Sequence, residues 1–195
     1  HVYPGLAVAR ELQAQGIPVV WMGTRAGLEA RVIPAAGIPM AWLEVTGLRG
    51  KGWKTWVTAP FRLVMALAQS VMIMLEHKPV AVLGMGGFVA GPGGLVAALM
   101  GKPVIIHEQN AVVGLTNKLL SKVCRRVLEG FPGTFPASDK VQATGNPVRT
   151  DIAALPAPLE RLADREDQKV HVLVIGGSLG ASALNQVVPQ ALALL

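Results

Sequence analysis

Apolar runs of a few residues alternate with longer segments of helical pattern along most of the chain. Strands are predicted at residues 19–22, 40–45, 80–83, 104–106 and 126–128, and helices at residues 4–15, 28–36, 54–77, 95–100 and 115–123. The strands are apolar at successive positions rather than alternating with polar residues, as in strands that are covered on both faces. Strands separated by helices predict an α/β fold with a doubly wound parallel sheet.

The pattern changes after residue 150. Pro156, Pro158 and a charged run at 160–167 predict a linker over residues 151–168. Residues 170–175 then predict another buried strand, followed by a glycine turn at 176–180 and a helix. We therefore expect a Rossmann-like domain over residues 1–150 and the start of a second one over 169–195. Because the chain begins with His and ends inside a predicted helix, we expect both ends to be cut.

Composition narrows the class of protein. The single cysteine, Cys124, excludes an internal disulfide, so a disulfide-stapled exported fold is excluded. We find no signal peptide and no uninterrupted apolar run of about 20 residues, so we expect a cytosolic chain that does not span a membrane. The net charge of +6 favours an anionic partner, such as a phosphate-bearing substrate, a nucleic acid or an anionic bilayer.

The cations are concentrated with aromatic residues in one stretch. No acidic residue lies between Glu44 and Glu76, a segment that contains four cations and three aromatic residues. This mixture suits a membrane interface better than a nucleic-acid groove. The alternative is that the apolar stripe of the predicted helix at 54–77 only covers the sheet. The predicted docking residues are Lys54, Trp56, Val57, Phe61, Val64, Leu67 and Lys122.

A glycine-rich loop is predicted over residues 84–94, directly after a strand, with six glycines among its 11 residues. Glycines at that position let backbone N–H groups approach a phosphate at a helix N-terminus. The spacing does not fit G-x-G-x-x-G, because Val89 occupies the last glycine position, which argues against a nicotinamide or flavin site. The alternative is a purely structural turn.

Two further segments carry polar groups at predicted strand ends. His107, Glu108, Gln109 and Asn110 could supply a general base and orient ligand hydroxyls, or else only satisfy backbone groups. The turn at 176–180 fits both a G-x-S-x-G nucleophile elbow and a phosphate-binding turn, so Ser178 stays open between these roles. No Asp-x-Asp pair or His/Cys cluster indicates a metal site, and we expect no metal and no cofactor.

Taken together, these motifs resemble the MurG family of UDP-N-acetylglucosamine transferases. The segments that match are HVYPG at 1–5, GLRGKG at 47–52, the loop at 84–94, HEQN at 107–110, LTNK at 115–118, GNPVR at 145–149 and GGSLGA at 176–181. The resemblance implies an inverting enzyme of GT-B fold that transfers N-acetylglucosamine from UDP-GlcNAc to the 4-hydroxyl of undecaprenyl-diphosphate-linked N-acetylmuramyl pentapeptide. That step converts lipid I to lipid II in peptidoglycan synthesis.

The resemblance also implies roles for domains and residues. Residues 1–150 would bind the acceptor, without the family's first strand and glycine loop, and residues 169–195 would begin the donor domain. His1 and Glu108 are the candidate bases, with His1 preferred because histidine titrates near neutral pH. The family often has Tyr where this chain has Phe88. The implied donor-binding residues are Asn110, Arg149 and Ser178, and the implied acceptor-diphosphate residues are Gly86, Gly87, Phe88 and Asn117.

The expected location is the cytoplasmic face of the inner membrane, as a peripheral protein. Expected partners are UDP-GlcNAc, lipid I, the anionic membrane surface and other cell-wall and division proteins, but no nucleic acid. We expect these 195 residues alone to be inactive. Two alternatives remain from the residues themselves: an α/β-hydrolase with Ser178 as nucleophile, and a non-enzymatic basic module that binds a membrane surface or RNA.

Overall fold

The computed structural model describes residues 1–44, 53–163, 172–175 and 181–193. The chain divides into two compact units, His1–Ala154 and Leu155–Leu195. The strands are β1 (Trp21–Thr24), β2 (Met40–Leu43), β3 (Val82–Gly84), β4 (Val104–Glu108), β5 (Arg126–Glu129) and β6 (Val141–Ala143). The helices are α1 (Val2–Ala14), α2 (Glu29–Ala35), α3 (Trp53–His77), α4 (Gly87–Leu99), α5 (Leu115–Leu120), α6 (Thr150–Ala153), α7 (Pro158–Ala163) and α8 (Ala181–Leu192).

The first unit is built on parallel strands, as the sequence predicts. One sheet has the order β3-β4-β5-β6, and β1 pairs with β2 in a second sheet. Strand β6 was not predicted, because only three residues form it and two of them are exposed, which leaves no apolar run to detect. In the larger sheet, Ile106 of β4 pairs with Val127 of β5, so the strand ends lie at one edge.

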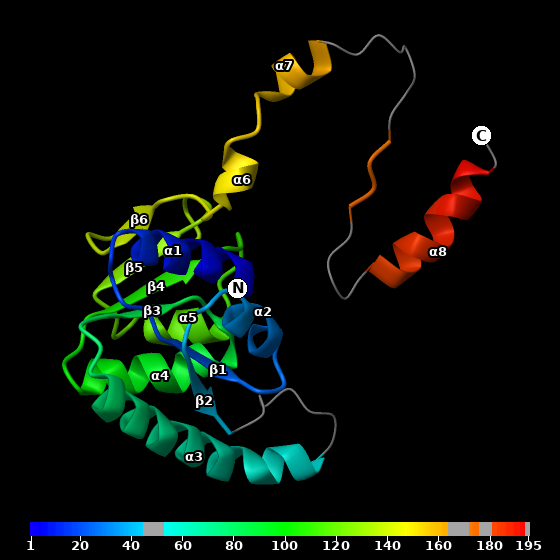
Figure 1. The fold of residues 1–195 in the computed structure, drawn as a ribbon. Helices are drawn as coiled ribbons and strands as arrows, with labels where there is room; N and C mark the ends of the chain where they lie inside the picture. The colour runs from blue at the N-terminus through cyan, green and yellow to red at the C-terminus, as the bar shows by residue number, and fades with distance from the viewer. Residues whose placement is uncertain (45–52, 164–171, 176–180, 194–195) are drawn as a thin grey trace. The chain divides into compact units, whose positions relative to one another are not determined.

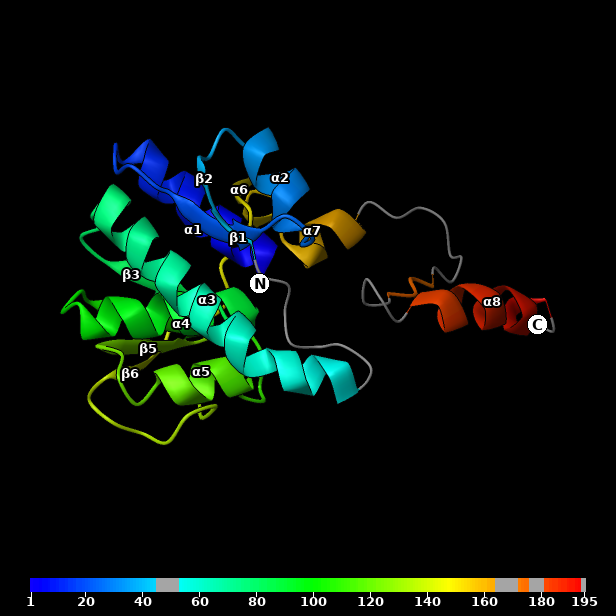
Figure 2. The same cartoon turned by 90° about the horizontal axis from the view of Figure 1, so that it is seen from below.

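Helices cover both faces of the larger sheet. Figure 1 shows α1 on one face and α4 with α5 on the other, and Figure 2 shows α3 lying across α4 on its outer side. Fully buried side chains of the sheet, among them Val104, Ile106 and Val127, form the main core on the side of α4 and α5. A second cluster, which includes Leu6 and Ile33, packs α1 and α2 together.

The predicted loop at 84–94 is mostly helix, and this expectation is wrong. Helix α4 begins at Gly87, eight residues before the predicted helix. A Cβ on Gly93 would lie 2.9 Å from the sulfur of Met22, and one on Gly94 would lie 2.9 Å from Cδ1 of Leu120. These glycines therefore let α4 pack closely against β1 and α5, where a side chain would force the elements apart.

The second unit contains α7 and α8 among its described residues. Residues 172–175 were predicted as part of a buried strand, but the structure has no strand there and their side chains are exposed. A strand is stabilised by backbone pairing, and the described part of this unit offers no neighbouring strand. Residues 170 and 171 of that prediction, and the glycine turn at 176–180, lie outside the described residues.

Candidate functional site

Polar side chains gather at the carboxyl edge of the four-stranded sheet. Strand β4 ends at Glu108, and β3 ends at Gly84, two residues before α4 is capped by Gly86. The imidazole of His1 lies against this turn, since a Cβ on Gly86 would be 3.1 Å from His1 Cε1. In parallel sheets the carboxyl edge is where ligands bind, so these groups define the candidate site.

Glu108 is fully buried beneath this edge and accepts four hydrogen bonds. Its Oε1 accepts from the backbone N and side-chain Nδ2 of Asn110, at 3.2 and 2.9 Å. Its Oε2 accepts from the backbone N of Gly114 and Nδ2 of Asn117, at 3.1 and 3.0 Å. Burial raises the pKa of the Glu108 carboxyl, but these hydrogen bonds outweigh burial and hold the pKa below its ordinary value. A carboxylate so occupied is suited to hold the 109–117 segment in place.

Asn117 is the buried partner of Glu108 on α5. Its Nδ2 also donates to the carbonyl oxygen of His107 at 3.0 Å, which fixes the orientation of its amide. The Oδ1 atom of Asn117 has no hydrogen-bond partner among the described residues. Oδ1 is itself buried and both bonds of Nδ2 go to protein atoms, so Asn117 offers no exposed polar atom for the predicted contact with the acceptor.

His107 points to the opposite side of β4 from Glu108, because side chains alternate along a strand. Its Nε2 lies 3.0 Å from the carbonyl oxygen of Gly145, and its Nδ1 lies 3.1 Å from Nε2 of Gln109. Oε1 of Gln109 is in turn 2.7 Å from Nδ1 of His1. A continuous set of hydrogen bonds thus joins residues 107, 109 and 145 to the first residue of the chain. The sequence motifs gave no sign of this contact between residues 1 and 109.

The N-terminus of α4 presents unpaired backbone donors to the same edge. Gly86 caps the helix with φ of 93°, no side chain caps it, and its first turn carries no acidic residue. The first N–H groups of a helix have no partner inside it and attract anions. Gly86 and Gly87 lie at this helix N-terminus, and their contact with the acceptor diphosphate stays a prediction. The half-buried side chain of Phe88 instead packs against the cluster of Leu43 and Ala66.

The predicted donor residues have different surroundings. Asn110 is exposed, although its amide is bound to Glu108. Arg149 is half exposed and forms an ion pair with Asp151 at 3.2 Å. An ion pair at such an exposed position contributes little to stability. Ser178 lies outside the described residues. Asn146 donates from Nδ2 to the backbone oxygen of Gln109 at 3.2 Å, which joins the 145–149 segment to the site.

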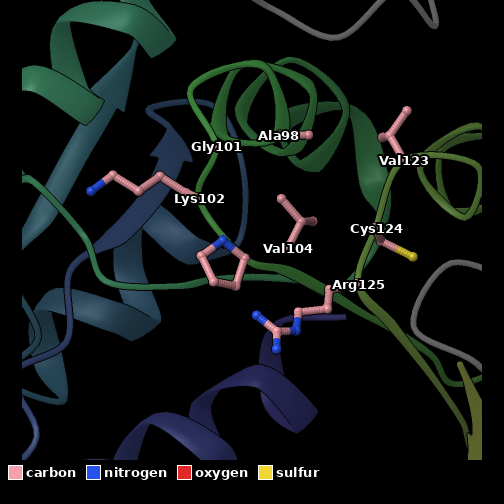
Figure 3. A pocket seen from close by; sticks show the side chains of 8 residues that line it. Ala98, Gly101, Lys102, Val104, Val123, Cys124 and Arg125 are labelled. Carbon is pink, nitrogen blue, oxygen red and sulfur yellow. The ribbon is translucent and has the colours of Figure 1, made fainter.

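Two cavities of about 260 Å³ each flank the sheet. One lies beside His107 and Gly145, and its lining also comes from Val8, Leu83, Met85, Leu128, Thr144, Asn146 and Pro147. The other lies at the amino ends of β4 and β5, away from the candidate site, and Figure 3 shows the side chains around it. Cys124 lines this second cavity, and burial raises the pKa of its thiol although Lys140 opposes the shift.

Within the described parts of the chain, no three His, Cys, Asp or Glu side chains are grouped to hold a metal ion.

Helix α3 carries an exposed apolar surface. The side chains of Phe61 and Val64 are 74% and 64% exposed, and Met65, Met72 and Leu75 are also exposed. Leu67 was predicted to share this surface, but it packs against the main core on the inner face of the helix. Lys122 is exposed after the end of α5. The side chains of Lys54, Trp56 and Val57 lie outside the described residues.

The segment Ala59–His77 of α3 is long and apolar enough to cross a bilayer, judged by length and composition alone. The sequence reasoning missed this, because Arg62 and Glu76 interrupt the apolar run without making it polar on average. One stripe of the segment is buried in the fold: Ala66, Ser70 and Met74 are at most 3% exposed. This stripe packs α3 on α4 and β2, which is how a helix lies along a domain surface.

Comparison with known proteins places these features in context. The sequence profile of the glycosyltransferase family 28 N-terminal domain matches residues 1–129. The UDP-N-acetylglucosamine–N-acetylmuramyl-(pentapeptide) pyrophosphoryl-undecaprenol N-acetylglucosamine transferase of Alkalilimnicola ehrlichii is 56% identical over 100% of this chain and 54% of the relative. The enzyme of the same name from Nitrosococcus oceani is 54% identical with the same coverage. The crystal structure of Acinetobacter baumannii MurG matches with a TM-score of 0.79 and 44% identity, over 100% of this chain and 54% of that one. The chain spans about half the length of the curated relatives it matches.

Proposed function

The chain belongs to glycosyltransferase family 28, and on that premise we propose that it forms the acceptor side of an enzyme that makes lipid II. The enzyme would transfer N-acetylglucosamine from UDP-GlcNAc to the 4-hydroxyl of undecaprenyl-diphosphate-linked N-acetylmuramyl pentapeptide. The names of the relatives, which match the whole chain at 54–56% identity, support this substrate pair. Family membership also removes the support for a hydrolase with Ser178 as nucleophile and for a non-enzymatic module.

The observation that carries the proposal is the position of His1 at the N-terminus of α4. The exposed imidazole is held by Gln109 at 2.7 Å and lies against Gly86, whose turn offers backbone donors for an anion. A diphosphate bound by the N–H groups at Gly86 and Gly87 would bring the sugar attached to it close to the imidazole. His1 would then be the base that takes the proton from the attacking hydroxyl.

The structure changes the role that we propose for Glu108. All four of its hydrogen bonds come from protein groups, it is buried, and its pKa is lowered. A base needs contact with the reacting hydroxyl and a pKa near the working pH, and Glu108 lacks both. We propose instead that Glu108 is a positioning residue, which holds Asn110 in the orientation that meets the sugar nucleotide.

We propose that the donor is bound by Asn110, Arg149 and Ser178, with the second unit as the start of the donor domain. The exposed Arg149–Asp151 pair costs little to break, so the guanidinium is free to meet a diphosphate. Inversion needs no covalent intermediate in this scheme. The 4-hydroxyl oxygen bonds to the anomeric carbon, the bond from that carbon to the diphosphate breaks, and UDP leaves with the electron pair.

The function is tested by transfer of labelled N-acetylglucosamine from UDP-GlcNAc to the lipid-linked muramyl pentapeptide, with the full-length protein. We expect His1→Ala to lower kcat/KM by roughly 10²-fold or more, the usual scale for a positioned base. Tyr3→Ala, which changes an exposed side chain in the first turn of α1, serves as the matched control and should leave the rate unchanged. No transfer by the wild-type protein would overturn the proposed function, and a His1→Ala variant of normal rate would remove His1 from the role of base.

We also propose that the exposed face of α3 docks the enzyme on the cytoplasmic surface of the inner membrane. Phe61 and Val64 have the most exposed of the described apolar side chains on this face, and the net charge of +6 favours an anionic leaflet. Insertion of the two side chains would contribute roughly 1.5–3 kcal/mol each. The two insertion energies together support reversible attachment to the membrane. During this attachment the inner stripe of α3, which includes Ala66, Ser70 and Met74, would stay packed in the fold.

Docking is tested by sedimentation of the full-length protein with vesicles of phosphatidylglycerol and phosphatidylethanolamine. The variant with Phe61→Glu and Val64→Glu should bind at least about 100-fold more weakly, because it loses about 3 kcal/mol or more of insertion energy. The control is Val80→Glu with Leu99→Glu, which adds the same charge at two exposed apolar positions outside α3. Equal vesicle binding by the two folded variants would place the docking surface elsewhere.

A further inference from the structure

The hydrogen bonds that join His107, Gln109 and His1 fix where each proton lies. At one end, the carbonyl oxygen of Gly145 can only accept, so Nε2 of His107 at 3.0 Å must carry a proton. In the neutral imidazole, Nδ1 of His107 is then an acceptor. It faces Nε2 of Gln109 at 3.1 Å, which donates to it.

A second backbone carbonyl fixes the amide of Gln109 independently. Nε2 of Gln109 also lies 3.2 Å from the carbonyl oxygen of His107, which again can only accept. If the amide turned over, its oxygen would face this carbonyl oxygen and the lone pair of the His107 ring. The nitrogen of Gln109 therefore faces residue 107, and Oε1 faces His1.

The orientation of Gln109 sets the tautomer of His1. An amide oxygen only accepts, so the contact of 2.7 Å requires a proton on Nδ1 of His1. Nε2 of the neutral ring then carries the lone pair. Nε2 of His1 makes no hydrogen bond to the described residues, and the His1 side chain is exposed. The lone pair on Nε2 is therefore accessible to a ligand bound at the N-terminus of α4.

We propose that Gln109 is a positioning residue, which holds His1 as the Nδ1–H tautomer with Nε2 as the basic atom, and that His107 and the Gly145 carbonyl hold Gln109. This inference rests on the proposed function. In the transfer step, the proton of the 4-hydroxyl moves to Nε2 as its oxygen bonds to the anomeric carbon and UDP departs. The Nδ1–H bond to Gln109 is kept throughout, and the imidazolium afterwards releases the Nε2 proton to water.

The tautomer is tested directly by NMR of the full-length protein with ¹⁵N-labelled histidine. Two-bond correlations between ring nitrogens and carbon-bound protons distinguish the two neutral tautomers, and loss of a signal in His1→Gln assigns the residue. We expect His1 with its proton on Nδ1 and His107 with its proton on Nε2. Protonation of His1 on Nε2 in the wild-type protein would overturn the inference.

Kinetics test whether this orientation is used. Gln109→Leu keeps a side chain of similar size but no acceptor, so it should lower kcat by about 10²-fold while KM for both substrates stays unchanged. Gln142→Leu, the same change at an exposed position of β6, is the control and should have normal kcat. A normal kcat for Gln109→Leu, or a loss that appears in KM rather than in kcat, would overturn the positioning role.

The two proposals fail in different ways. If the wild-type protein transfers no sugar, the proposed function is wrong, and the NMR result still decides the tautomer of His1. If the wild-type protein is active and His1→Ala is inactive, but Gln109→Leu has normal kcat, only the role of Gln109 is wrong.

Discussion

The change of Glu108 to Gln tests the buried carboxylate with almost no change of shape. Glu108 accepts four hydrogen bonds, two on each oxygen. An amide keeps one oxygen, so two of the four donors must face an NH₂ group. Asn117 cannot turn over to compensate, because its Nδ2 also donates to the His107 carbonyl. Hydrogen bonds to charged groups are each worth about 1.5–3 kcal/mol, so the loss of two should lower the free energy of unfolding by about 3–6 kcal/mol.

The assay is urea unfolding of the full-length protein, followed by circular dichroism, with hydrogen exchange to locate the effect. Faster exchange should appear at the amides of Asn110 and Gly114, which donate to the carboxylate. Glu44→Gln is the matched control: its carboxylate is exposed and pairs with Arg25, so its loss should cost at most about 1 kcal/mol. A destabilisation by Glu108→Gln that is no larger than that of Glu44→Gln would refute the account of the buried carboxylate.

The pH dependence of the same variant has a definite sign. The pKa of Glu108 is lower in the folded protein than in the unfolded chain, so the unfolded chain binds more protons in acid. The stabilisation from Glu108 is therefore complete above the ordinary carboxyl pKa of 4.5 and is lost as the pH falls through the folded value. The difference in stability between wild type and Glu108→Gln should be largest at neutral pH and should narrow below pH 4.5.

Two further predictions concern the packing of α4 and the reactivity of the cysteine. Gly94→Ala should destabilise the protein by about 1–3 kcal/mol in thermal or urea unfolding, because its Cβ would overlap the side chain of Leu120. Gly91→Ala in the same helix is the control. Its Cβ would lie 3.6 Å from Thr116, an ordinary contact, so this variant should be neutral or stabilising. Cys124 should react slowly with iodoacetamide at neutral pH, because burial raises its thiol pKa, and its labelling should accelerate when urea unfolds the chain; rapid labelling of the folded protein would contradict this.

Much of the fold follows from the sequence, since the apolar runs mark five of the six strands in the described residues. The predicted parallel α/β architecture and the GT-B fold class are confirmed, and so is the resemblance to the MurG family. The exception at α4 arises because glycines at 84–94 were interpreted as a loop. Sequence patterns cannot distinguish a glycine that permits a turn from one that permits close packing, as Gly93 and Gly94 do.

The candidate site was predicted less completely than the fold. The motif at 107–110 was identified as polar and functional, but the pattern could not assign separate roles to its four residues. Those roles depend on which side of β4 His107 and Glu108 face and on partners far along the chain. His1 contacts Gln109 across 108 positions, and His107 contacts Gly145 across 38. Contacts at such separations leave no periodic signal in one sequence.

The alternation of side chains along β4 explains how one short motif serves two purposes. Glu108 faces α5 and holds the following segment through a buried carboxylate, while His107 faces the other side and orients Gln109 toward His1. Pairing of β4 with β5 between Ile105–Arg126 and Glu108–Glu129 keeps this register. A slip by one residue would turn the carboxylate toward the side of α1 and the imidazole into the core beside Asn117. The register of this strand therefore determines at once the stability of the sheet edge and the direction in which His1 presents its lone pair.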